Sequence, residues 1–125
     1  MKYIILMMMS LWVAACSAHD ENYYRQHPGE LQQALNKCPA QKPKDISCDQ
    51  LKVVALRVNE LGYQLRMNPQ EFGKQILVLQ ETLAKQQKAL QQNNNQPDLR
   101  ELVNKNKQNL KERLAIVKWL ESPES

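Results

Sequence analysis

Apolar residues recur at helical spacing through the second half of the chain. After residue 68 they follow one another in steps of four, three, four and seven, which is the spacing of a heptad-like seam. Asn68 as the N-cap, Pro69 at the first helical position and Glu71 three residues after the cap mark the start. The pattern predicts a helix over residues 69–92 whose seam consists of Phe72, Ile76, Leu79, Leu83 and Leu90.

A second amphipathic stretch of nearly equal length follows over residues 98–121. The Asn-rich segment 91–97 ends in a proline and predicts a reversal between the two helices. We therefore expect an antiparallel helical hairpin over residues 68–121. Asn106 stands in the apolar seam and is expected at its edge near water, although a seam asparagine can also fix register. The inward stripe expected for the last helix is Leu99, Leu102, Val103, Leu110, Leu114, Val117 and Leu120.

Two shorter helices are predicted before the hairpin. Pro28 suits the first turn of a helix over residues 28–37, and Glu30 is favourable near its positive end. Ser47 and Gln50 fit a capping box that starts a helix over residues 48–66. The segment between them has two prolines and no apolar periodicity, so it predicts a loop. The fold class is therefore all-α, and the inward stripe of the longer helix is Leu51, Val54, Ala55, Val58, Leu61 and Leu65.

The first 15 residues have a different pattern, which is typical of a secretory signal peptide. A short basic start with Lys2 precedes an apolar run, and as a helix this run would span roughly 20 Å, less than the ~30 Å core of a bilayer. Val-Ala-Ala-Cys at residues 13–16 resembles the bacterial lipobox. The resemblance implies cleavage before Cys16 and lipid on its sulfur, with several acyl chains giving stable membrane anchoring. The alternative is a conventional signal that leaves Cys16 as a free thiol.

The expected domain organisation is a signal peptide over residues 1–15, a lipidated tether over 16–22 and one helical domain over 23–125. Within that domain, residues 23–66 form a disulfide-stapled helix pair and 68–121 the hairpin. The chain has 17 basic and 13 acidic residues, and removal of Lys2 leaves a net charge of about +3. This balance is too mild to indicate nucleic-acid binding, and the basic residues of the last helix fit a solvated face.

Export places the cysteines in an oxidising compartment. Once Cys16 carries lipid, Cys38 and Cys48 are the remaining pair, which predicts one disulfide across the proline-containing loop. A metal site that combines these cysteines with His27 is the alternative, but paired Cys-x-x-Cys spacing is absent from the sequence. We expect neither a metal nor a cofactor.

Candidate catalytic residues are sparse. Outside the signal peptide the chain has two histidines, and neither a Ser-His-Asp arrangement nor a glycine-rich phosphate loop can be assembled. His27 is expected to cap or pack at the first helix, and Trp119 to close the end of the hairpin. We therefore expect a protein that acts by contact and not as an enzyme.

The order of motifs resembles the small entry exclusion lipoproteins of conjugative elements, the EexN type. A lipobox is followed by Tyr24-x-x-His27-Pro28-x-Glu30-Leu31 and then by two cysteines, so the resemblance covers residues 1–60. It implies a recipient envelope protein that blocks redundant DNA transfer by contacting a type IV mating channel. The contact surface is expected around Tyr23, Tyr24, His27, Pro28 and Glu30, at the disulfide loop, or at both.

Two features depart from that family. The segment between the cysteines is richer in proline and lysine, and the hairpin extends beyond the short domain expected. The alternative function is a structural or accessory envelope lipoprotein whose hairpin binds a helical partner, and self-association stays open. An exported enzyme is a third hypothesis. Ser17 follows Cys16 where an aspartate would favour inner-membrane retention, so a periplasm-facing position on the outer membrane is favoured.

Overall fold

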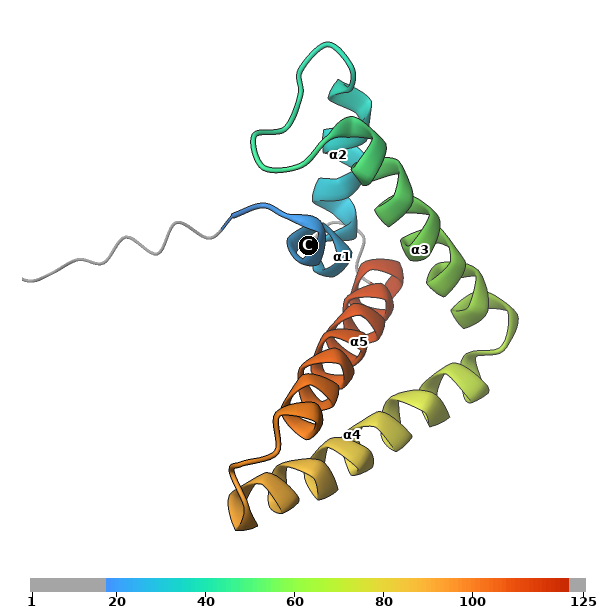
Figure 1. The fold of residues 1–125 in the computed structure, drawn as a ribbon. Coiled ribbons are helices and arrows are strands. Elements are labelled where there is room, and N and C mark those ends of the chain that lie inside the picture. Colours follow the sequence, from blue (N-terminus) through green and yellow to red (C-terminus); the bar gives the residue numbers. More distant parts are fainter. Residues whose placement is uncertain (1–17, 122–125) are drawn as a thin grey trace, which may run out of the picture.

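The computed structural model describes residues 18–121 and is all-helical over them (Figure 1). Five helices follow in order: α1 (Glu21–Gln26), α2 (Pro28–Lys37), α3 (Cys48–Met67), α4 (Pro69–Gln92) and α5 (Pro97–Glu121). The predicted all-α fold class is confirmed. Cys16 and the predicted signal peptide lie outside the described residues.

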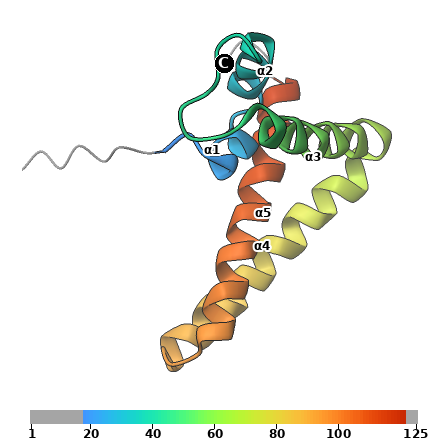
Figure 2. The ribbon, with the colours of Figure 1, turned by 45° about the horizontal axis from the view of Figure 1, so that its top comes forward.

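The three long helices form an open, bent arrangement. α4 leads away from the end of α3, and α5 returns along α4, so the predicted antiparallel hairpin is present (Figures 1 and 2). α5 then continues beyond the hairpin and packs against α1, α2 and α3. The last helix therefore joins the hairpin to the N-terminal helices.

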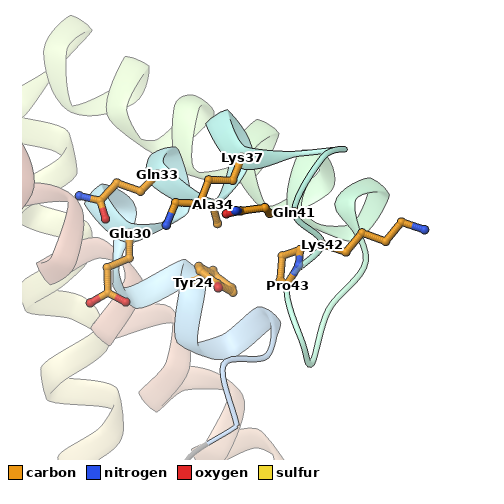
Figure 3. Close-up of a pocket in the computed structure, with 8 residues that line it drawn as sticks. All are labelled: Tyr24, Glu30, Gln33, Ala34, Lys37, Gln41, Lys42 and Pro43. Atoms are coloured by element: carbon orange, nitrogen blue, oxygen red, sulfur yellow. The ribbon is translucent and has the colours of Figure 1, made fainter.

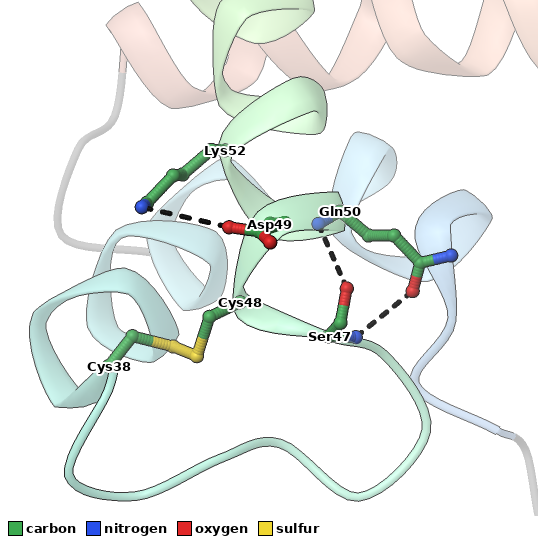
Figure 4. The surroundings of a disulfide bond; sticks show 6 residues. All are labelled: Cys38, Ser47, Cys48, Asp49, Gln50 and Lys52. Carbon is green, nitrogen blue, oxygen red and sulfur yellow. Dashed lines mark hydrogen bonds and ion pairs between the residues drawn. A yellow bond between two sulfur atoms is a disulfide. The ribbon is translucent and has the colours of Figure 1, made fainter.

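The helix starts follow the sequence signals. The Ser47 hydroxyl accepts a hydrogen bond from the Gln50 backbone N–H at 3.1 Å, and the Gln50 side chain accepts one from the Ser47 N–H at 3.0 Å (Figure 4). The Asn68 side chain accepts a hydrogen bond from the Glu71 N–H at 3.1 Å, with Pro69 in the first turn. Each cap satisfies N–H groups that a helix start would otherwise leave unpaired, and this fixes where α3 and α4 begin.

The predicted disulfide joins Cys38 at the end of α2 to Cys48 at the start of α3, with a Cα–Cα distance of 6.0 Å (Figure 4). It closes the loop between the two helices. Ile46, just before α3, is buried in the core, so this loop is attached to the fold at its end as well as at its cysteines.

One buried cluster draws residues from all five helices. Leu31, Leu51 and Ile116 are fully buried at its centre. Burial of an aliphatic side chain contributes about 1.5–3 kcal/mol, so this cluster is the main source of stability for the described residues. Its members are Tyr24, Leu31, Ile46, Leu51, Val54, Val58, Leu61, Phe72 and Ile116.

The predicted stripe of the last helix was wrong in part. Ile116 lies outside that stripe and is fully buried, whereas Leu102 and Leu114 within it are 47% and 43% exposed. The cause is that α5 packs first on α4 and then on α1–α3. Ile116 follows Val103 by 13 residues, and at 100° per residue it lies about 140° around the helix from Val103. A single stripe therefore cannot cover both the contact with α4 and the contact with α1–α3.

Two further expectations need correction. Residues 16–22 do not all form a tether, because α1 begins at Glu21 with Asp20 as its N-cap. Asn106 does not lie at a water-exposed edge: its side chain donates a hydrogen bond to the Gln86 side chain of α4 at 3.1 Å and is partly buried. This contact links the two helices of the hairpin.

Among residues 18–121, none of the helices has the length and apolar character needed to cross a membrane.

Candidate functional site

The short helix α1 places the candidate contact residues. The Asp20 side chain accepts a hydrogen bond from the Tyr23 N–H at 3.0 Å and so starts the helix. Tyr24 then points into the core and is 7% exposed, while Tyr23 lies towards solvent. Because a helix this short is marginal in isolation, α1 depends on contacts with the rest of the molecule, and burial of Tyr24 is one of them.

Tyr23 is stacked between two histidines. Its ring centroid lies 3.9 Å from that of His19 and 4.0 Å from that of His27, with interplanar angles of 4° and 17°. The four-residue spacing along α1 brings Tyr23 and His27 to the same side of the helix, whereas His19 precedes the N-cap Asp20 and covers the other face of the Tyr23 ring. His27 Nδ1 lies 2.7 Å from the Tyr23 carbonyl oxygen, to which it donates a hydrogen bond. Both histidines are exposed, so the stack presents flat aromatic edges to solvent.

The Tyr23 hydroxyl donates a hydrogen bond to the Glu30 carboxylate. This hydrogen bond, together with burial and the negative charge of Glu30, raises the pKa of Tyr23 to about 12. Tyr23 therefore stays neutral at physiological pH. We call the exposed group of His19, Tyr23, His27 and Glu30 the N-terminal surface.

The disulfide loop lies beside the N-terminal surface. The His19 backbone N–H donates a hydrogen bond to the Asp45 carboxylate at 3.3 Å, across 26 residues of sequence. Tyr24 and Glu30 also line a pocket of about 380 Å³ with the loop residue Pro43. Figure 3 shows Tyr24 between Glu30 on one side and Pro43 on the other. The two segments proposed from the sequence as contact regions are thus neighbours in space.

A buried carboxylate attaches α1 to the rest of the molecule. Glu112 of α5 is 5% exposed and lies 3.5 Å from Arg25 of α1 and 3.6 Å from Arg57 of α3. One negative charge therefore faces two positive charges where three helices meet. These ion pairs connect α1, which carries part of the N-terminal surface, to α3 and α5.

A second hollow, of about 280 Å³, lies between the α1–α2 junction and the C-terminal part of α5. His27 and Pro28 line it on one side and Trp119 on the other. Trp119 is partly buried and also packs against the core cluster. Its side chain therefore lies close to the candidate contact residues, a position that the sequence did not indicate.

The structure divides the five sequence-predicted contact residues into two groups. Tyr23, His27 and Glu30 come together at the surface, whereas Tyr24 and Pro28 are buried beneath it. The latter two position α1 and α2 and offer little surface to a partner. Two residues of this region, His19 and Asp45, were not named from the sequence. His19 precedes the N-cap of α1, and Asp45 is brought to it across 26 residues, so helical spacing indicates neither position.

Within residues 18–121, no group of three or more histidine, cysteine, aspartate or glutamate side chains is placed to hold a metal ion. The chemistry available at the N-terminal surface is hydrogen bonding through imidazole and carboxylate groups and stacking through the rings. Comparison with known proteins found no match among family models, curated proteins or solved structures.

Proposed function

We propose that this protein is a lipid-anchored bacterial envelope protein that limits redundant conjugative transfer by contacting a type IV mating channel. In this proposal Cys16 carries the lipid, and the domain faces the periplasm from the outer membrane. The N-terminal surface is the contact region. No catalytic step, cofactor or nucleic acid is involved.

Two features of the sequence support the proposal. Val-Ala-Ala-Cys at residues 13–16 follows a basic start and an apolar run, as in lipoprotein signal peptides. The motif from Tyr24 to Leu31, followed by two cysteines, resembles the exclusion lipoproteins. Formation of the Cys38–Cys48 disulfide is consistent with an exported protein, since disulfides persist in oxidising compartments.

The observation that carries the proposal is how close the N-terminal surface is to Cys16 along the chain. His19 is the third residue after Cys16, and an extended chain spans at most about 3.6 Å per residue. A lipid on Cys16 would therefore hold His19 within about 11 Å of the membrane surface. A partner that reaches this surface must itself lie at the membrane, as a mating channel does.

The chemistry of this surface also fits a protein partner. Glu30 accepts hydrogen bonds and attracts a lysine or arginine, while the outer faces of the two imidazoles offer stacking surfaces. Such aromatic and charged groups carry much of the binding energy in protein interfaces. The tight stack reduces the side-chain entropy that would be lost on binding.

Charge reversal at one position tests the contact directly. Glu30→Lys in recipient cells is expected to raise conjugation from a donor with the cognate element by tenfold or more, since a repelled contact costs at least ~1.4 kcal/mol. Glu81→Lys is the matched control, because Glu81 is also an exposed glutamate but lies on α4. Equal exclusion by wild type and the Glu30→Lys variant, at equal expression, would remove the N-terminal surface from the mechanism.

The second candidate function is a structural or accessory envelope protein that binds through its hairpin. Leu77 and Val78 of α4 are 61% and 52% exposed, which leaves apolar surface on the hairpin's outer side. This function predicts normal conjugation and loss of assembly when Leu79 or Leu110 is replaced by a charged residue. Conjugation frequency therefore separates the two candidates.

A further inference from the structure

The outer side of α3 carries large apolar side chains that no part of the described chain covers. Val53, Leu56, Tyr63 and Met67 are 59%, 71%, 63% and 66% exposed. In Figure 1, α3 runs along the edge of the molecule, with α1, α2 and α5 on its inner side. Leaving these side chains in water is unfavourable, and grouped apolar exposure of this kind marks interaction sites.

These residues form one line along the helix. Residues 53, 56, 60, 63 and 67 follow one another at intervals of three and four, so at 100° per residue they fall within about 80° of the helix surface. The buried residues of α3, among them Val54 and Leu61, lie on the opposite side. We call this line the α3 stripe, and it is about 21 Å long.

Glu60 occupies the centre of the α3 stripe. Its carboxylate accepts a hydrogen bond from the Gln64 side chain at 3.2 Å, and none of the ion pairs found among residues 18–121 involves it. Lys52 and Arg66 lie along one flank, and both are exposed. Lys52 lies 3.8 Å from Asp49 one turn earlier, and the two side chains are 70% and 96% exposed. The apolar line therefore has a negative charge at its centre, and one flank has a basic residue at each end, of which Lys52 is partly neutralised by Asp49.

We propose that the α3 stripe docks an amphipathic helix of another protein that carries a basic residue opposite Glu60. Heptad-spaced apolar side chains on that helix would cover Val53, Leu56, Tyr63 and Met67. Acidic residues beside its apolar line would face the Lys52 and Arg66 flank. The proposal concerns a different helix from the N-terminal surface and does not depend on the exclusion function.

The C-terminal end of the α3 stripe provides a pocket for one side chain of this partner. Tyr63 and Met67 border a hollow of about 300 Å³ at the corner between α3 and α4, with the buried Phe72 ring in its wall. An apolar side chain that enters this hollow would fix how far along α3 the partner lies. Knobs of this kind set the register of paired helices.

Charge complementarity favours another protein over a second copy of this chain. A second copy that covers the whole stripe in antiparallel orientation would be centred on residue 60, so the two Glu60 carboxylates would meet at the two-fold axis. The same pairing would bring Lys52 of one copy near Arg66 of the other. Both contacts are between like charges, which are costly when desolvated.

A charge swap with two synthetic helical peptides tests this assignment. Both peptides have leucine at heptad positions and glutamate along one flank, and the central residue is lysine in one and glutamate in the other. Using the purified full-length protein, fluorescence anisotropy should show at least about tenfold tighter binding of the lysine peptide. In the Glu60→Lys variant the preference should reverse.

The position of binding is tested with matched apolar substitutions. Leu56→Asp should weaken binding of the lysine peptide more than about tenfold, whereas Leu77→Asp, at a comparably exposed leucine of α4, should leave it unchanged. Circular dichroism confirms that both variants are folded. Lack of binding, or equal affinity for the two peptides, would overturn the proposal. Two other results would also overturn the proposal. A dimer seen in sedimentation velocity that is lost in Leu56→Asp would assign the α3 stripe to a second copy of the chain. Binding to anionic vesicles that is lost in Leu56→Asp would assign it to lipid.

Discussion

Replacement of Glu112 by glutamine is expected to weaken the attachment of α5 to the N-terminal helices. The Glu112 carboxylate is 5% exposed and lies 3.5 Å from Arg25 and 3.6 Å from Arg57. Glutamine keeps the size of the side chain but removes its charge. Two arginines would then face each other across a neutral group.

The magnitude follows from the geometry. At 3.5 Å and an effective dielectric constant of about 20, each ion pair has a Coulomb energy of roughly 5 kcal/mol, most of which offsets the desolvation of the buried carboxylate. Removing one partner of a buried ion pair typically costs about 3–5 kcal/mol. The Arg25 and Arg57 side chains are 32% and 36% exposed, so water partly replaces the lost partner and reduces this cost. We expect a loss of about 2 kcal/mol in the free energy of unfolding.

Urea unfolding followed by circular dichroism measures this loss at neutral pH. Glu101→Gln is the matched control on the same helix: Glu101 lies 3.2 Å from Lys105, but the two side chains are 69% and 70% exposed. An exposed pair of this kind contributes less than about 0.5 kcal/mol. If Glu112→Gln and Glu101→Gln lower stability equally, the three-helix contact through Glu112 is not a significant source of stability.

Three further predictions concern the core, the disulfide and Tyr23. Ile116→Ala should lower the free energy of unfolding by about 2–5 kcal/mol and Leu114→Ala by less than about 1 kcal/mol, and equal losses in chemical denaturation would contradict the burial assigned to α5. Reduction of the disulfide, which spans a sequence separation of 10, should lower the unfolding free energy by about 2.7 kcal/mol, and an unchanged denaturation midpoint would refute this. Absorbance titration should place the pKa of Tyr23 at about 12, and Glu30→Gln should bring it down towards 10; no change in that variant would rule out the hydrogen bond as the cause. Because the folded state holds the Tyr23 proton more tightly, this contribution to stability is complete below pH 10 and is lost as the pH rises to about 12.

Helix starts and the disulfide were predictable because their signals are local. The Ser47–Gln50 capping box and the Asn68-Pro69 start act within a single turn, and both form hydrogen bonds in the expected pattern. The pairing of Cys38 with Cys48 followed from a count of the available cysteines. These features depend little on how the helices pack.

Features that depend on packing were predicted less well. Helix α1 has six residues and is held in part by the burial of Tyr24, which no periodicity in so short a segment reveals. Ile116 was missed because α5 changes partners along its length. A buried glutamate such as Glu112 resembles a surface residue in sequence, and its two arginines come from distant segments.

The candidate surfaces also combine features that the local sequence predicts with features that depend on packing. Tyr23, His27 and Glu30 were predicted as candidate contact residues because they belong to a short motif or lie next to it, and they are close in space. The contact between His19 and Asp45 crosses 26 residues and could not be predicted from spacing. The α3 stripe has the spacing of a helix seam, but only the position of the buried face shows that it points to solvent.

Conjugation frequency into recipients that express either the wild-type chain or Cys16→Ser tests the central proposal most directly. Donors with and without the cognate element provide the comparison, and immunoblots confirm equal expression. The proposal predicts that wild type lowers transfer from the cognate donor alone and that Cys16→Ser restores it. Unchanged transfer with wild type, from a donor that carries the chain's own genetic element, would contradict anchored exclusion as the function of this protein.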